Sequence, residues 1–246
     1  MTGRIALVTG GIGGIGTEIC RSLAEAGCRV IACDLPASSE RLAQFSDDLH
    51  GLDVHFEAAD VSRMDDCERL VQRIRDEHGP ISLLVNGAGI TRDISLRKMS
   101  SEQWHEVLRV NLDSVFNLCR LLADDMCERG FGRIVNISSI IGQTGAFGQS
   151  NYAAAKAGMH GFTMALAREL AGKGVTVNSV SPGYIDTAMT AAIPAELRKQ
   201  MISAIPVGRI GTPADVAHAI AFLCAEQSGY LTGINLPVNG GLFISF

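Results

Sequence analysis

The sequence predicts an α/β fold, with one domain in which a doubly wound parallel sheet carries helices on both faces. Short apolar runs rich in β-branched residues alternate along the chain with amphipathic segments of helical period. The apolar runs are nearly continuous, as expected for parallel strands that are buried on both faces. No repeat, low-complexity tract or linker-like break divides the 246 residues. We therefore expect a single domain over 1–246.

The strands are expected where the apolar runs lie, joined by right-handed crossovers through the intervening helices. The expected strands are Ile5 to Val8, Arg29 to Cys33, Val54 to Phe56, Leu83 to Val85, Ile134 to Ile137 and Val175 to Val180. The helical patterns predict helices over residues 14–26, 39–50, 64–77, 101–128, 151–172 and 213–224.

Two apolar features bear on assembly. The stretch from Trp104 to Leu122 has apolar residues around the whole helix, so this helix needs two buried sides. The sequence ends in the apolar tail Leu242-Phe243-Ile244-Ser245-Phe246, which would be exposed on a monomer. Both features favour a homo-oligomer, although the helix would be equally satisfied deep in the core of one subunit.

Composition excludes several classes of function. A formal charge of -5 argues against nucleic-acid binding, which normally needs a basic surface. No apolar run reaches the ~18 residues of a membrane span, and Met1 to Arg4 lead directly into a short strand, so we expect a cytoplasmic protein. The seven cysteines form no CxxC pair and are expected to be reduced. The six histidines have no metal-binding spacing, so no metal is expected and His160 is interpreted as a packed side chain.

The glycine-rich segment after the first strand is typical of a phosphate-binding turn. Two patterns fit: Gly11, Gly13 and Gly16 match GxGxxG, and Thr9, Gly10, Gly14 and Gly16 match TGxxxGxG. Glycines let the backbone approach a pyrophosphate, and the helix that follows offers free N–H groups at its N-terminus. The placement between a strand and a helix favours a dinucleotide site over a plain tight turn.

Asp34 ends the second strand, eighteen residues after Gly16. A carboxylate there can accept hydrogen bonds from the adenosine ribose hydroxyls, and it would repel the additional phosphate of NADP. The sequence therefore predicts NAD(H), with NADP(H) as the alternative because Arg41 is a cation close by. Asp60, after the third strand, is placed to accept a hydrogen bond from the adenine amino group.

Tyr152 and Lys156 are four residues apart, which places a phenol and an ammonium on one face of a helix. A phenol titrates near ~10, so proton donation at neutral pH needs a shift of about three units, or roughly 4 kcal/mol. Unit charges ~4 Å apart supply about 4 kcal/mol at an effective dielectric constant near 20. The spacing thus predicts a proton donor, although on its own it also fits a surface tyrosine beside a solvated lysine.

The chain resembles the short-chain dehydrogenase/reductase family over essentially its whole length. The residues that carry this resemblance are the segment Thr9 to Gly16, then Asn86, Asn111, Ser139, Tyr152, Lys156 and Pro182-Gly183. The resemblance implies a Rossmann-like NAD(P)-binding domain that holds both cofactor and substrate. One departure is Gly87, where the family usually has Asn, so a side-chain hydrogen bond near the cofactor is expected to be missing.

Further stretches resemble the branch of this family that reduces acetoacetyl-CoA, with the branch that reduces 3-oxoacyl groups on acyl carrier protein a close second. They are Gly89 to Asp93, Asn136 to Ser139, Phe147 to Gln149, Lys156 to Gly158 and Ser181 to Ile185. Asp34 departs from the first branch, which mostly uses NADPH. The implied reaction transfers hydride from NADH to a 3-oxoacyl-CoA, giving an (R)-3-hydroxyacyl-CoA, in polyhydroxybutyrate synthesis.

The resemblance also implies roles for individual residues. Tyr152 donates the proton, Ser139 holds the substrate oxygen, Lys156 lowers the pKa of the phenol and binds the nicotinamide ribose, and Asn111 relays protons to Lys156. The implied cofactor-binding residues are Gly10, Gly13, Gly14, Ile15, Gly16, Asp34, Asp60, Val61, Asn86, Ala88, Gly89, Tyr152, Lys156, Pro182, Gly183, Ile185 and Thr187. The implied substrate-binding residues are Asp93, Ser139, Phe147, Gln149, Tyr152 and Tyr184.

Residues 184–212 are expected to form a substrate lid, because Met189, Ile193 and Met201 are apolar and prolines interrupt the segment. A pair of packed helices is nearly as good an interpretation. The family implies a homotetramer. Two alternatives remain open: Arg129 and Lys173 could dock an acidic carrier protein, or the fold could be a non-catalytic module that senses NAD(H).

Overall fold

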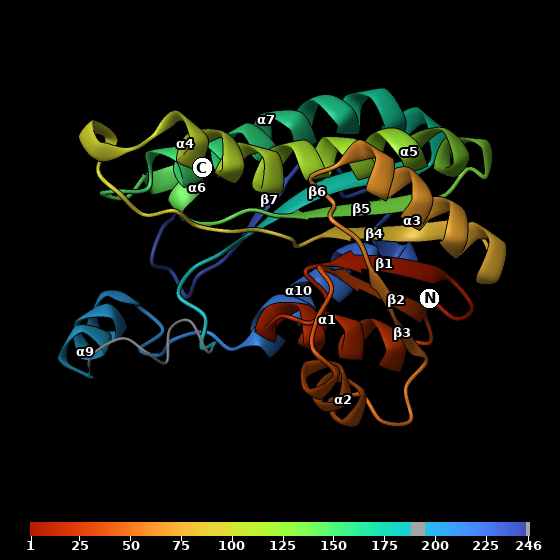
Figure 1. Ribbon diagram of the computed structural model, residues 1–246, viewed down its shortest axis with the longest axis horizontal. Coiled ribbons are helices and arrows are strands. Elements are labelled where there is room, and N and C mark those ends of the chain that lie inside the picture. Colours follow the sequence, from red (N-terminus) through yellow and green to blue (C-terminus); the bar gives the residue numbers. More distant parts are fainter. Residues whose placement is uncertain (188–194, 245–246) are drawn as a thin grey trace.

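The computed structural model describes residues 1–187 and 195–244, and it has three layers with a parallel sheet in the middle (Figure 1). The strand order is β3-β2-β1-β4-β5-β6-β7, and all neighbours are parallel. The strands are β1 (Ile5–Thr9), β2 (Arg29–Asp34), β3 (Val54–Ala58), β4 (Ile81–Asn86), β5 (Gly132–Ile137), β6 (Val175–Pro182) and β7 (Asn235–Val238). The predicted doubly wound α/β fold is confirmed.

Each face of the sheet is covered by its own set of helices. One face carries α3 (Met64–Glu77), α5 (Ser114–Glu128) and α7 (Ser150–Leu170), and the other carries α1 (Gly14–Glu25), α2 (Ser39–Asp48) and α10 (Pro213–Cys224) (Figure 1). Successive strand residues point to opposite faces, so Leu7 packs in the first layer and Val8 in the second. Burial of these continuous apolar strands stabilises the sheet on both sides.

One strand and several short helical segments were not expected from the sequence. The edge strand β7 is short and contains Pro237, which is tolerated only where one side of a strand needs no ladder hydrogen bonds. Helix α9 (Ala195–Ala204) lies away from the sheet (Figure 1). The expected lid over 184–212 includes residues 188–194, among them Met189 and Ile193, which lie outside the described residues. The remaining short helical segments are Leu96–Lys98, Ile141–Thr144 (α6), Ala171–Lys173 and Glu226–Ser228.

The helix predicted over 101–128 is present without a break, but it is not α-helical throughout. It consists of α4 (Ser101–Leu108), a π-helical turn over Arg109–Asp113, and α5. Polar side chains compete with the backbone ladder here, because the Asn111 amide donates to the Val107 carbonyl at 2.9 Å and the Ser114 hydroxyl donates to the Val110 carbonyl at 2.6 Å. Such π turns are frequent at functional sites.

The strand order reverses between β1 and β4, and the turns that follow these two strands touch. The Thr9 hydroxyl accepts hydrogen bonds from the backbone N–H groups of Gly87 and Ala88 at 3.0 and 3.1 Å. A Cβ at Gly87 would lie 2.7 Å from the Thr9 carbonyl oxygen. Glycine at this position therefore lets the two turns approach without either having to shift. Ligands bind at such reversal points in open α/β sheets.

The seven cysteines are free thiols, and none of the described helices has the length and apolar character that crossing a bilayer requires.

We predict that Gly16→Ala destabilises the protein, because a Cβ there would lie 2.0 Å from the Gly10 carbonyl oxygen and the turn after β1 would have to open. The expected loss is on the order of 3 kcal/mol in the free energy of unfolding, measured by denaturant titration. Gly172→Ala is the control, because its Cβ would meet nothing within 4 Å; it should change stability by less than about 1 kcal/mol. Equal stability of the two variants would contradict the packing argument.

Candidate active site

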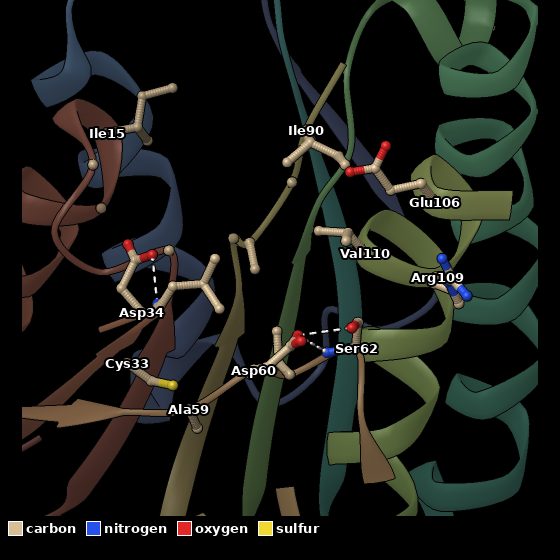
Figure 2. Close-up of a pocket in the computed structure, with 18 of the residues that line it drawn as sticks. Ile15, Cys33, Asp34, Ala59, Asp60, Ser62, Ile90, Glu106, Arg109 and Val110 are labelled. Carbon is tan, nitrogen blue, oxygen red and sulfur yellow. Dashed lines mark hydrogen bonds between the residues drawn. The ribbon is translucent and has the colours of Figure 1, made fainter. Parts of the chain in front are cut away.

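A cleft of about 1130 Å³ opens at the point where the strand order reverses (Figure 2). It is bounded by the turn after β1, by the residues that follow β2, β3 and β4, and by the π-helical turn. The expected cofactor-binding residues that line it are Gly10, Gly13, Gly14, Ile15, Gly16, Asp34, Asp60, Val61, Ala88, Gly89, Tyr152 and Thr187. The structure thus brings together residues from six separate stretches of the chain.

The other expected cofactor residues do not line this cleft. Asn86 is buried within the sheet, where its amide donates to Asn136 at 2.8 Å. Ile185 is buried among the side chains beneath α10. Pro182 ends β6 and pairs with Val238, and Gly183 follows it. Lys156 is buried against the end of β5. These residues support the floor of the site and do not form its wall.

Two carboxylates lie along one side of the cleft, Asp34 at the end of β2 and Asp60 after β3 (Figure 2). Asp34 accepts a hydrogen bond from the Leu35 backbone N–H at 2.9 Å, which fixes its side chain at the end of β2. Asp60 accepts from both the backbone N–H and the hydroxyl of Ser62, at 3.0 and 2.7 Å. Arg41 reaches over the turn after β1, where its guanidinium donates to the Ile12 carbonyl at 3.3 Å.

The cleft has lining residues that the sequence did not indicate. Ile90, Glu106, Arg109 and Val110 face it from the loop after β4 and from the α4 and π-turn segment (Figure 2). Glu106 accepts two hydrogen bonds from Arg92, at 2.6 and 2.8 Å, which close this rim. Ile90 directly follows the Gly89 of the family motif, which is a usable signal. Arg109 and Val110 belong to no motif.

Lys156 is buried in α7, one helical turn after Tyr152. Its ammonium donates a hydrogen bond of 2.7 Å to the Ile137 carbonyl at the end of β5 and lies 5.6 Å from the centre of the Tyr152 ring. Burial lowers the pKa of Lys156 to about 8, because removal from water disfavours the charged form. A lysine in this state stays largely protonated at neutral pH and can release its proton more readily than a surface lysine.

Tyr152 lines the cleft, and its hydroxyl shares a hydrogen bond with Ser139. The protein's own groups raise the pKa of the phenol: burial raises it most, the hydrogen bond with Ser139 lowers it, and the charge of Asp93 raises it further. The expectation that Lys156 lowers this pKa is therefore wrong for the protein alone. Burial dominates because the ammonium is directed to the Ile137 carbonyl and not to the phenol oxygen.

Asn111 lies in the π-helical turn and is fully buried. Its amide nitrogen donates to the carbonyls of Ile90 and Val107, both at 2.9 Å. Its side-chain oxygen is buried and has no hydrogen-bond partner within the described part of the chain. A buried oxygen without a hydrogen-bond partner costs free energy. This atom is therefore a site where a bound water molecule or ligand can donate a hydrogen bond.

Apart from Ser139 and Tyr152, the expected substrate residues fall into two places. Gln149 donates to Asp93 at 2.9 Å, and a backbone hydrogen bond from Ile94 to Gly148 ties the two loops together beside α7. Phe147, on the same loop, is 96% exposed. Tyr184 lines a second, smaller cavity of about 480 Å³ near α10.

The arrangement fits proton transfer to an oxygen held by Ser139 and Tyr152 beside a ligand in the cleft. Within 1–187 and 195–244, no cluster of three or more His, Cys, Asp or Glu side chains is arranged to hold a metal ion.

Comparisons with known proteins agree with this geometry. Residues 10–243 match a family model described as enoyl-(acyl carrier protein) reductase. An acetoacetyl-CoA reductase of Allochromatium vinosum is 56% identical over 98% of this chain and 99% of its own. An acetoacetyl-CoA reductase of Cupriavidus necator is 48% identical over 98% of this chain and 99% of its own, and a 3-oxoacyl-[acyl-carrier-protein] reductase of Vibrio cholerae is 43% identical over 99% of both. The chain therefore belongs to the short-chain dehydrogenase/reductase family, and it is an oxidoreductase acting on a CH–OH group.

Proposed function

We propose that this protein is an acetoacetyl-CoA reductase, which uses NADH to form (R)-3-hydroxybutyryl-CoA and related 3-hydroxyacyl-CoA thioesters. The observation that carries the proposal is the hydrogen-bonded pair of Tyr152 and Ser139 at the cleft, with the buried ammonium of Lys156 behind it. Two relatives that match nearly the whole chain are named acetoacetyl-CoA reductase. Polyhydroxybutyrate synthesis in the cytoplasm is the setting that we propose for this reaction.

The family uses NAD(P), and the residues of the cleft fit such a dinucleotide. The turn after β1 brings backbone N–H groups and the N-terminus of α1 to one wall, where a pyrophosphate would lie. Asp34 would accept the two hydroxyls of the adenosine ribose, and Asp60 would accept the adenine amino group. The unpaired oxygen of Asn111 supplies an acceptor deeper in the site.

The carboxylate of Asp34 supports a preference for NADH. It is held at the end of β2 by the Leu35 backbone N–H, so it cannot swing away without losing that hydrogen bond. The additional phosphate of NADPH would lie beside this negative charge. Arg41 is the group that favours the alternative cofactor, because its guanidinium lies in the same cleft. We infer that the fixed carboxylate outweighs it, because Arg41 already donates to the Ile12 carbonyl.

In the proposed mechanism, Ser139 and Tyr152 hold the ketone oxygen of the substrate by two hydrogen bonds. A nicotinamide held in the cleft would supply the hydride and, once oxidised, a positive charge near the phenol. Tyr152 then gives its proton to the substrate oxygen. Ser139 stabilises the negative charge that develops there before the proton arrives. Lys156 then returns a proton to the phenolate of Tyr152, since its lowered pKa of about 8 makes the ammonium a ready donor.

Asn111 extends this proton path toward solvent. Its buried oxygen can accept a hydrogen bond from a water molecule between itself and Lys156. The π-helical turn points the Asn111 side chain inward. Its two amide hydrogens are already donated to the Ile90 and Val107 carbonyls, so the oxygen is the atom left to bind water. Lys156 would therefore regain its proton through water and not directly from bulk solvent.

The mouth of the site suits a thioester with a short acyl group. The Gln149–Asp93 pair beside Phe147 would border the acetoacetyl group, and the described parts of the expected lid, residues 184–187 and 195–212, would lie over it. We propose coenzyme A as the carrier of the acyl group, because Arg129 is engaged inside the protein. Its guanidinium donates to the Ile81 carbonyl and to Ser82, and it pairs with Asp125. An acidic carrier protein would find only Lys173 of the two expected cations free to pair.

We propose a homotetramer, and two separate apolar faces support it. Phe116 on α5 and Met164 on α7 are about half exposed in one helical layer, and Phe222 on α10 is about half exposed in the other. Exposed large apolar side chains on opposite layers favour two independent interfaces, and two interfaces related by twofold axes build a tetramer.

We predict that the protein reduces acetoacetyl-CoA with NADH and that Tyr152→Phe lowers kcat by on the order of 10²- to 10⁴-fold, because the proton donor is lost. Tyr230→Phe is the matched control, since this side chain is fully exposed and should leave kcat unchanged. Steady-state kinetics and NADH fluorescence titration check both variants. The same acetoacetyl group on acyl carrier protein should be the poorer substrate; a large preference for the carrier would instead favour fatty-acid synthesis. Unchanged turnover by Tyr152→Phe would favour the NAD(H)-sensing module.

We predict that kcat/KM is higher with NADH than with NADPH and that Asp34→Asn raises kcat/KM for NADPH by about tenfold to a hundredfold, since removing one charge relieves the repulsion of a phosphate. Asp47→Asn is the control, because it changes the net charge equally from the exposed side of α2. Better efficiency of the unsubstituted protein with NADPH would refute the role given to Asp34.

We predict that light scattering gives the intact protein four times the 26.1 kDa mass of one chain. Phe116→Asp should halve this mass. A carboxylate on α5 prevents burial of the α5 and α7 face, whereas the α10 face can still form a dimer. Leu96→Asp is the control and should keep the full mass. Leu96 is exposed, but it lies in the segment Leu96–Lys98 and belongs to neither face. A monomeric intact protein would contradict the assembly proposed here.

A further inference from the structure

His160 connects the helix of the active site to two strands of the sheet. It lies on α7 one turn after Lys156 and two turns after Tyr152, so the three side chains share one face of the helix. Its Nε2 lies 3.1 Å from the Ser138 hydroxyl at the end of β5, and its Nδ1 lies 3.2 Å from the Ser179 hydroxyl on β6. The expectation that His160 is simply a packed side chain is therefore incomplete.

The protons of this cluster form a chain with one direction. The Ser138 hydroxyl donates to the Lys156 carbonyl at 2.9 Å, so it must accept from His160 Nε2–H. In a neutral ring Nδ1 is then an acceptor, and the Ser179 hydroxyl can donate to it. The side-chain oxygen of Asn235 also lies 3.1 Å from the Ser179 hydroxyl. It accepts from the Ser181 hydroxyl at 2.8 Å as well, so it keeps a donor when the Ser179 hydroxyl turns to His160. Burial and the charge of Lys156 both lower the pKa of His160, which keeps the ring neutral.

Ser138 occupies a decisive position along the chain. The residue before it, Ile137, accepts the hydrogen bond of the Lys156 ammonium, and the residue after it, Ser139, shares a hydrogen bond with Tyr152. The end of β5 is thus attached to α7 at three successive residues. The middle attachment is the hydrogen bond from the Ser138 hydroxyl to the Lys156 carbonyl, and it requires one orientation of that hydroxyl. Among the contacts described, only His160 Nε2–H can donate to the Ser138 oxygen and so hold this orientation.

We propose that His160 is a positioning residue for catalysis: its Nε2–H fixes Ser138, and Ser138 fixes the separation of the Ser139 and Tyr152 hydroxyls. The inference rests on the proposed function in requiring these two hydroxyls to act on one carbonyl oxygen. Displacement of such a pair by a fraction of an ångström reduces stabilisation of the transition state more than it reduces the affinity for substrate. The effect of losing His160 therefore falls on kcat and not on KM.

Both serines that contact the ring are buried, at 3% and 1% exposure for Ser138 and Ser179. An apolar side chain of similar volume would fill the same space, but it would leave two buried hydroxyls with fewer partners. The two nitrogens therefore have separable tasks. Nε2 serves the strand that carries Ser139, whereas Nδ1 serves only the neighbouring strand β6.

Two conservative substitutions separate these tasks. His160→Gln places an amide N–H where Nε2 lies and so keeps the bond to Ser138, whereas His160→Asn is shorter and places its amide near Nδ1. With acetoacetyl-CoA and NADH, His160→Asn should lower kcat about tenfold with KM within about twofold of the original. His160→Gln should keep kcat within about threefold. Equal kcat for the two variants would overturn the proposal, whether both fall or neither does.

Changes at the two serines provide matched controls. Ser138→Ala should reproduce the loss of kcat, and Ser138→Ala combined with His160→Asn should be no slower than either alone, because both break the same attachment. Ser179→Ala should keep kcat within about twofold even if it lowers the melting temperature. Additive losses at 138 and 160, or an equal loss of kcat from Ser179→Ala, would show a purely structural role.

The outcome does not depend on the identity of the acyl group. If the unsubstituted protein leaves acetoacetyl-CoA unreduced, the proposed function fails, and the same variants are then compared on the 3-oxoacyl substrate that it does reduce. The ranking of His160→Gln above His160→Asn in kcat is expected on any ketone that Tyr152 protonates. Should His160→Asn not fold, His160→Gln and Ser138→Ala still decide the matter, because the first must retain kcat and the second must lose it.

Discussion

The ammonium of Lys156 is held inside the protein by one short hydrogen bond to the Ile137 carbonyl, and the geometry of the site depends on this bond. It attaches α7 to the end of β5, the two elements that carry Tyr152 and Ser139. Burial of an amine without a carboxylate partner is unfavourable, and the lowered pKa of about 8 is the physical expression of that cost. The protein thus keeps a destabilised cation at the place where the proposed mechanism calls for a proton donor.

The same burial explains why Tyr152 does not behave as its spacing suggests. A four-residue separation places the two side chains on one face, but it does not determine where the ammonium points. The ammonium bonds to a backbone carbonyl, and the phenol is left in a region where loss of water raises its pKa. In the proposed mechanism, charge supplied by a bound cofactor would act on a phenol that the protein itself keeps protonated, which would couple proton donation to cofactor binding.

Most of the fold could be predicted because its causes are local. Continuous apolar strands, helical periodicity and the glycine turn after β1 are each readable over a few residues, and they place the cleft correctly. The π-helical turn could not be predicted, because it arises from competition between Asn111 and the backbone ladder. Strand β7 was missed since it is short and contains proline. The roles of Arg109, Val110 and His160 depend on contacts between distant segments, which no motif records.

The placement of the cysteines has a consequence for chemical durability. Burial raises the pKa of the thiols of Cys20, Cys67, Cys119 and Cys224 to about 12, and it raises those of Cys28, Cys33 and Cys127 as well. Alkylating agents and peroxides attack the thiolate, and at neutral pH almost none is present. Six of the seven sulfhydryl groups are buried and are therefore slow to react with such reagents, and the partly exposed Cys127 is the thiol that they would reach first.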